Sequence, residues 1–222
     1  MHFVETELAN WTVLAGNGTL TLIDAGYPRD LPRVRRILNR IGGDLTTILL
    51  THGHSDHLGA VGGILAEDDG VEVLAAAEEL PNVRREVTHQ IGIRQLLPHL
   101  WRPSVLGWAV RAVRAGGLAE VAVSEPRAIR PDEPSLFSGH QVIPIFAPGH
   151  TPGHLAYWLP AERILVTGDA LVTGHPTSSE RGPQLLPAMF DHDRDLAADS
   201  FDDLMRRDAR IILPGHGPAL LR

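Results

Sequence analysis

Four short apolar segments of this chain run directly into glycine-flanked loops that carry histidine or aspartate. Loops at strand ends hold polar groups at fixed points of a rigid sheet, and adjacent glycines permit the sharp turns that bring distant loops together. The polar residues are His52, His54, Asp56 and His57 in the first loop, His150 in the second, Asp169 in the third and His216 in the fourth. The pattern predicts one site built from distant parts of the chain.

Nitrogen and oxygen donors make up this set, and the chain contains no cysteine. The absence of cysteine excludes disulfides, thiolate ligands and a cysteine nucleophile. Imidazole and carboxylate ligands suit zinc, and less exclusively iron or manganese. These five histidines and two aspartates exceed the four ligands of one tetrahedral ion, whereas two groups of three with a shared carboxylate use them all. We therefore expect two divalent metal ions, with zinc favoured, roughly 3.5–4 Å apart.

The remaining composition is that of one ordinary globular domain, which we expect to span residues 1–222. The formal net charge of −7 argues against a nucleic-acid binder. All 20 Lys+Arg residues are arginine, so a Schiff-base lysine and a phosphate-loop lysine are excluded. No apolar run reaches the roughly 18 to 20 residues of a membrane span, and residues 1–10 follow no signal-peptide pattern. We expect a cytoplasmic protein that acts on a small molecule, away from membranes.

Segments of strand composition outnumber helical ones and fall into two groups. This arrangement predicts an α/β (α+β) fold with two sheets packed face to face and helices outside. Strands are expected at 4–8, 11–14, 19–24, 45–50, 71–75, 119–123, 128–129, 141–146, 155–159, 163–167 and 211–213. Helices are expected near 32–41, 58–66 and 196–207, and the acidic run 191–195 is interpreted as the solvated start of the last helix.

Segment 81–117 differs from the rest, because its pattern predicts two or three helices broken at Pro98 and Pro103. It is apolar and basic, with a single acid, Glu86, against Arg84, Arg85, Arg94, Arg102, Arg111 and Arg114. Such an insert is a candidate lid over the site. The alternative is an amphipathic helical pair that closes the core.

The ordered combination of motifs resembles the signature of metallo-β-lactamase-fold hydrolases over about residues 10–217. The segments that carry the resemblance are 22–26 (LIDAG), 51–59 (THGHSDHLG), 148–154 (PGHTPGH), 167–169 (TGD) and 215–217 (GHG). The resemblance implies a four-layer αβ/βα sandwich with the metals at one edge of the sheets. It also implies His52, His54 and His150 at one metal, Asp56, His57 and His216 at the other, and Asp169 as the bridge.

This ligand set would support hydrolysis. A metal ion lowers the pKa of bound water to about 7, which gives a bridging hydroxide nucleophile, and it polarises the substrate carbonyl. Asp56 is assigned a catalytic part in orienting the nucleophile. Asp24 and His154 are expected to support the ligands from behind rather than to bind metal. His175 is the one remaining histidine close to the motifs, because it follows Asp169.

Histidine at position 57 and aspartate at 169 resemble glyoxalase-II-type thioesterases and related lactonases, so the expected substrate is a thioester or lactone. Only six residues follow His216, where we expect no helical region of the kind that grips glutathione thioesters in glyoxalase II. The insert could replace that wall, and its arginines would favour an anionic substrate. The alternatives are a single-iron dioxygenase of sulfur compounds, a phosphodiesterase or nuclease of the same fold, and a metal-stabilised binding module.

Overall fold

Two sheets, each with six strands, lie at the centre of the computed structural model, which describes residues 1–222. The first sheet has the order β1 (His2–Val4), β2 (Trp11–Gly16), β3 (Thr19–Ile23), β4 (Asp44–Leu49), β5 (Glu72–Ala75) and β6 (Arg127–Ala128). The second has the order β12 (Leu220–Leu221), β11 (Ile211–Pro214), β10 (Ile164–Gly168), β9 (Leu155–Leu159), β8 (His140–Phe146) and β7 (Ser135–Phe137). In the first sheet β3, β4, β5 and β6 are parallel neighbours, and in the second only β10 and β11 are.

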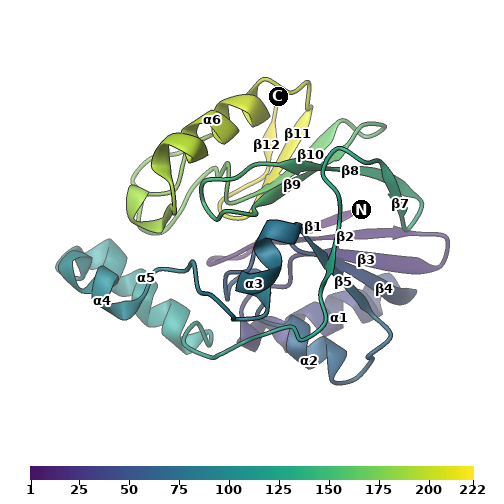
Figure 1. Cartoon of the computed structure of the whole chain (residues 1–222), viewed down its shortest axis with the longest axis horizontal. Coiled ribbons are helices and arrows are strands. Elements are labelled where there is room, and N and C mark those ends of the chain that lie inside the picture. Colours follow the sequence, from purple (N-terminus) through teal and green to yellow (C-terminus); the bar gives the residue numbers. More distant parts are fainter.

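Helices cover the outer faces of both sheets (Figure 1). The helices are α1 (Leu31–Ile41), α2 (Val61–Leu65), α3 (Leu80–Val83), α4 (Ile93–Leu96), α5 (Pro103–Arg114) and α6 (Arg194–Met205), with 3₁₀ turns at Pro28–Asp30, Ala77–Glu79, Leu97–His99 and Ala188–Phe190. Figure 1 shows α1 and α2 outside the first sheet, α6 outside the second, and α4 and α5 together at one end. No helix combines the length and the apolar character needed to cross a lipid bilayer.

Alternating side chains along the strands build this layered core. On β9, Leu155, Tyr157 and Leu159 face the first sheet, whereas Ala156 packs in the cluster that holds Leu204 of α6. Side chains of the first sheet alternate in the same way, and those on its outer face pack against α1 and α2. These helices contribute Val34, Leu38, Val61 and Ile64 to the cluster. The predicted four-layer αβ/βα sandwich is confirmed.

The insert 81–117 contains α4 and α5, and both prolines act where the sequence predicts. Pro103 opens α5, and Pro98 lies at the start of the 3₁₀ turn Leu97–His99. Trp108 and Ala112 of α5 pack in a separate apolar cluster with Tyr27 and Phe190. The insert therefore closes one end of the sandwich by packing against Tyr27, after β3, and Phe190, before α6. Whether it moves as a lid stays a prediction.

Two predicted strands are wrong, because side chains take the backbone groups that a sheet would use. In 4–8 the hydroxyl of Thr6 donates to the Ala9 carbonyl and accepts the Leu8 and Ala9 N–H groups, so β1 ends at Val4. In 119–123 the guanidinium of Arg85 donates to the Val121 carbonyl. The short edge strands β7 and β12 were not predicted.

Candidate metal centre

Loops that follow strands of both sheets meet at one edge of the sandwich. The segment after β4 carries His52, the β8–β9 connection carries His150, and Asp169 and His216 follow the ends of β10 and β11. Backbone hydrogen bonds fasten the loops to one another, from Leu155 N to Thr51 O at 2.8 Å and from Gly215 N to Gly168 O at 2.8 Å. Glycine is required at 215, since a Cβ there would lie 2.2 Å from Oδ1 of Asp169.

All seven predicted ligand residues come together in two adjoining groups. One group contains His52, His54, His150 and Asp169, and the other contains Asp56, His57 and His216. Within each group one potential ligand atom per residue lies within 4.8 Å of all the others. Six of the seven are buried, and the Asp56 side chain is 13% exposed. Asp56 is thus the member of the set that remains open to solvent.

Asp169 contacts members of both groups. Its Oδ1 lies 3.3 Å from Nε2 of His57. Its Oδ2 lies 3.1 Å from Nε2 of His216 and 3.4 Å from Nε2 of His150. Asp169 thus lies between the two groups, where the resemblance predicts a shared ligand, and its bridging role stays a prediction.

Each of the five imidazoles is held by one ring nitrogen and directs the other toward the cluster. Nδ1 of His57 bonds to Asp24 at 2.8 Å, Nδ1 of His150 to Asp191 at 3.3 Å, and Nε2 of His54 to the His89 carbonyl at 2.9 Å. Nδ1 of His216 bonds to the Leu8 carbonyl. Because a carbonyl or carboxylate can only accept, these bonds fix the proton on the outer nitrogen of the neutral ring and leave a lone pair facing inward.

The tautomer of His52 follows from the hydroxyl of Thr51. This hydroxyl donates its proton to Asp24 Oδ2 at 2.8 Å, so it can only accept from His52 Nδ1, which lies 3.0 Å away. Asp24 also accepts the backbone N–H of Thr51 at 2.8 Å. One buried aspartate therefore orients two of the five histidines.

The donor set fits a metal, because three of its inward-facing atoms have no hydrogen-bond partner in the protein. Nε2 of His52, Nε2 of His57 and Oδ1 of Asp169 are all buried without one. Buried polar atoms are nearly always paired, so three orphans at one point call for a cation. Imidazole nitrogens and carboxylate oxygens without sulfur suit zinc, iron or manganese.

The electrostatics divide the histidines into two kinds. Burial and the neighbouring imidazole of His57 lower the pKa of His52 well below its ordinary value, and burial with His150 does the same to His54. Burial also acts to lower the pKa of His57, but the carboxylates of Asp169, Asp24 and Asp56 outweigh it and raise the pKa. Burial acts to raise the pKa of Asp169, but His216 and His57 hold it well below its ordinary value. Without metal, burial thus favours the neutral forms of His52 and His54, whereas carboxylates favour the protonated form of His57.

Asp24 and His154 lie outside the two groups, and they bond to His57 and to the backbone N–H of Asp169, respectively. His154 Nε2 accepts the backbone N–H of Asp169 at 3.0 Å and so positions that residue. His175 is buried near His216, with ring centroids 4.9 Å apart, and lines the small cavity over the cluster. The interpretation of the run 191–195 is wrong at Asp191, whose 1% exposed side chain pairs with His150 and Arg194.

Glu79 supports two of the loops and was not found from the sequence. It ends the 3₁₀ turn after β5 and is fully buried. One carboxylate oxygen accepts the N–H of Gly53 at 2.8 Å and the amide of Asn82 at 2.6 Å. The other accepts the Thr151 hydroxyl at 2.8 Å and the N–H of Gly153 at 3.0 Å. A single carboxylate thereby joins the first histidine loop to the second.

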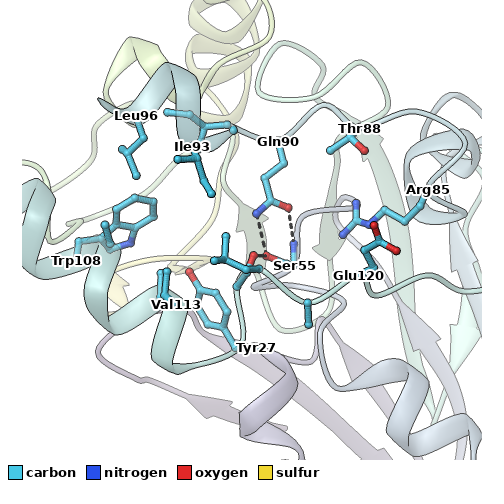
Figure 2. A pocket seen from close by; sticks show the side chains of 17 residues that line it. Tyr27, Ser55, Arg85, Thr88, Gln90, Ile93, Leu96, Trp108, Val113 and Glu120 are labelled. Atoms are coloured by element: carbon cyan, nitrogen blue, oxygen red, sulfur yellow. Dashed lines mark hydrogen bonds between the residues drawn. The ribbon is translucent and has the colours of Figure 1, made fainter. Parts of the chain in front are cut away.

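Two adjoining cavities open at the cluster. The smaller, of about 30 Å³, lies over His54, Asp56, His150, Asp169 and His216. The larger, of about 340 Å³, is bordered mainly by apolar side chains of the insert (Figure 2). Of the six arginines of the insert, only Arg85 lines the larger cavity and none lines the smaller. Arg111 instead pairs with Glu7 at 3.2 Å.

Sequence comparison defines the class of protein to which this fold and site belong. The Metallo-beta-lactamase superfamily matches residues 5–216. The chain therefore belongs to the metallo-β-lactamase superfamily.

Particular relatives have the names of hydrolases. The chain is 29% identical over 211 residues to "Probable metallo-hydrolase YflN" of Bacillus subtilis (strain 168), a match that covers 90% of this chain and 75% of the relative. It is 28% identical over 145 residues to "Hydroxyacylglutathione hydrolase" of Bartonella quintana (strain Toulouse), covering 64% of this chain and 42% of the relative. The match therefore spans less than half of that enzyme.

Solved structures share the fold over almost the whole chain. The metallo-beta-lactamase family protein TTHA1429 from Thermus thermophilus superposes with a TM-score of 0.69 at 24% identity, covering 99% of this chain and 73% of that one. The BLEG-1 B3 metallo-beta-lactamase gives 0.68 at 22% identity, covering 99% and 94%. At these identities the likeness concerns the fold alone.

Proposed function

We propose that the protein is a dinuclear metal-dependent hydrolase that cleaves an ester-like bond, in a thioester or a lactone. The observation that carries the proposal is the set of five imidazoles, each held from outside and open toward one of two groups, with Asp169 in contact with both. Membership of the superfamily and the metallo-hydrolase names of relatives support hydrolysis. The hydroxyacylglutathione hydrolases among the relatives favour an acyl carbon as the point of attack.

The position of each residue in the site indicates which cation it would bind. His52, His54 and His150 would hold one cation, Asp56, His57 and His216 the other, and Asp169 both. When bound, two such cations supply a nucleophile from water at neutral pH and polarise the scissile carbonyl. Asp56, whose side chain remains 13% exposed, borders the cavity where substrate and water meet and would accept a hydrogen bond from the attacking water.

The overall reaction consumes one water per bond broken. Oxygen from water joins the acyl carbon, and the bond from that carbon to sulfur or oxygen breaks. One hydrogen of the water passes to the leaving thiol or alcohol, and the other is lost from the acid product to solvent. No oxidant or reductant takes part, which separates this proposal from the single-iron dioxygenase.

Metal analysis of the purified chain, followed by a panel of neutral thioesters, lactones and a bis-aryl phosphodiester, tests the proposal. We expect about two metal ions per chain and turnover of thioesters or lactones that chelation abolishes. One iron per chain with oxygen consumption would overturn it in favour of the dioxygenase. Turnover of the phosphodiester alone would overturn it in favour of a nuclease-like activity.

A further inference from the structure

We propose that the larger cavity beside the metal centre binds a neutral, apolar arm of the substrate, so that the enzyme acts on esters of medium-length aliphatic chains. The chemistry of this inference rests on the proposed function. The substrate class rests on the cavity, and it replaces the anionic substrate that the arginines of the insert suggest.

The volume of the smaller cavity indicates that most of a substrate lies outside it. The cavity over the cluster has about 30 Å³, which is room for about two or three water molecules. The larger cavity has about 340 Å³, within the range of small-molecule sites. A reacting carbonyl group fits the first cavity, and the second, which shares four lining residues with it, offers space for the body of a substrate.

The two cavities share a border, so one molecule can occupy both. Tyr27, Gln90, Ile91 and Trp108 line both. Gln90 also fixes the insert to the first histidine loop, because its amide donates to the Ser55 hydroxyl at 2.8 Å and accepts the Ser55 N–H at 3.0 Å (Figure 2). The arm of a substrate whose carbonyl lies at the metals is thereby directed along α5.

The side chains of the larger cavity are those of an apolar binding site. Ten of its 17 lining residues are hydrophobic, and α4 and α5 supply Ile93, Leu96, Trp108 and Val113 among them. Figure 2 shows these four grouped at one end of the cavity. Ile93 is 60% exposed and Val113 is 48% exposed. An aliphatic chain laid against them would remove this apolar surface from water.

The charges of the cavity do not favour an anion. Arg85 donates through Nε to the Val121 carbonyl and through Nη1 to the Gly53 carbonyl, both at 2.7 Å. Glu120 lines the same cavity, and Figure 2 shows it beside Arg85. The one cation is therefore occupied by backbone and accompanied by a carboxylate. A terminal carboxylate on the substrate would gain little from Arg85 and would meet Glu120.

A chain-length series on the metal-loaded protein tests this assignment. The probes are acetyl, butyryl, hexanoyl and octanoyl thioesters of N-acetylcysteamine, with a second series that ends in a carboxylate. We expect kcat/KM to rise about fourfold per added methylene, which is ~0.8 kcal/mol, until the cavity is full. The carboxylate-ended esters should be poorer substrates than neutral esters of equal length. A flat neutral series, or preference for the carboxylate-ended one, would overturn the inference.

Matched substitutions on α5 locate the binding site. Ala109→Phe fills the cavity, whereas Val110→Phe places the same side chain at a neighbouring exposed position that does not line it. We expect Ala109→Phe to reduce the octanoyl-to-acetyl ratio of kcat/KM toward one, and Val110→Phe to preserve the wild-type ratio. An unchanged ratio in folded Ala109→Phe would contradict the assignment.

A milder pair keeps the test valid if the phenylalanine in the cavity prevents folding. Val113→Thr keeps the shape of the cavity wall but makes it polar, and Val110→Thr is the control outside the cavity. We expect Val113→Thr to reduce the octanoyl-to-acetyl ratio about fourfold, the equivalent of one methyl group. Equal ratios in the two threonine variants would overturn the assignment.

Binding of a non-hydrolysable analogue separates this inference from the proposed function. The S-octyl thioether of N-acetylcysteamine lacks the carbonyl, and its affinity can be compared by calorimetry with that of the S-ethyl thioether. Tighter binding of the octyl compound without turnover of any ester would preserve the cavity assignment and overturn the hydrolase. Turnover of esters with equal affinity for the two thioethers would preserve the hydrolase and overturn the cavity assignment.

Discussion

The carboxylate of Asp24 lies 2.8 Å from Nδ1 of His57, and both side chains are buried. The same carboxylate receives the hydroxyl and the backbone N–H of Thr51. Since Asp24 has left-handed backbone geometry, with φ of 60°, the turn after β3 is itself shaped to present this side chain. Asp24 lies outside the cluster, yet its bond to Nδ1 of His57 leaves Nε2 as the ring nitrogen that faces the cluster.

Asp24→Asn tests this control of the tautomer. The amide of asparagine can donate to Nδ1 of His57, which would move the ring proton to Nε2 and cover the lone pair that faces the cluster. We expect the affinity for Zn²⁺ to fall roughly 10–100-fold, as for other residues that orient metal ligands. Competition with a chromophoric chelator measures it. Asp44→Asn, at an exposed position on β4, is the control, and equal affinity of the two variants would refute the orientation of His57 by Asp24.

Asp169→Ala should disrupt both groups, whereas His216→Ala should disrupt only one. Asp169 lies within 3.4 Å of a histidine of each group, and His216 belongs to the second group alone. We expect His216→Ala to retain about one metal ion per chain and Asp169→Ala to retain less, because only the latter removes a shared ligand. Elemental analysis after gel filtration reads this out, with exposed Asp199→Ala as the control. Equal metal contents in the two ligand variants would argue against a bridge.

Glu79→Gln should destabilise the fold around the two histidine loops. Each carboxylate oxygen of Glu79 accepts two hydrogen bonds. In glutamine an NH₂ group, which cannot accept, would replace one of these oxygens, so two hydrogen bonds would be lost. We expect a loss of about 3 kcal/mol in the free energy of unfolding, and for a chain of this size a Tm lower by roughly 6–12 °C. Differential scanning calorimetry measures the shift. Glu78→Gln changes the exposed neighbour, and a Tm as low as that of Glu79→Gln would refute the role of the buried carboxylate.

Metal binding should release protons and strengthen as pH rises. The carboxylates around His57 and His216 raise the pKa of both rings against the effect of burial. In the metal-free fold these rings therefore keep a proton to higher pH than an ordinary imidazole, and a metal can bind only the neutral ring. We expect Zn²⁺ to displace protons from both rings at pH near 6.5 and fewer at pH near 9. Calorimetry in buffers of different ionisation enthalpy gives the number, and a heat independent of buffer at the lower pH would disprove the linkage.

The residues that meet at the candidate metal centre could be predicted from the sequence because their chemistry is local. His-Gly-His and Gly-His-Gly segments at strand ends carry both the donor atoms and the turn that presents them. The sandwich was predictable for a similar reason, since periodic apolar strands in two groups leave few ways to bury both faces. The prediction failed where function depends on tertiary contacts that no local pattern encodes.

Glu78 and Glu79 illustrate this limit. Both are acidic and adjacent, yet the fold exposes the first and buries the second under four donors. Asp191 and Asp193 show the same contrast, because Asp193 caps α6 as expected whereas Asp191 turns inward to His150. The sequence shows how many arginines the insert contains but not where their side chains point, which depends on the packing of α4 and α5. Only Arg85 lines the larger cavity.

The ligand set is split between the two sheets of the sandwich. His52, His54, Asp56 and His57 follow β4 of the first sheet, and the other ligands come from loops between strands of the second. A pair of bound cations would therefore cross-link the two sheets. Because the chain contains no cysteine, no disulfide can do so. A proteolytic cut between residues 130 and 134, where the chain passes from one sheet to the other, should leave two fragments that stay associated while metal is bound and separate more readily once it is removed.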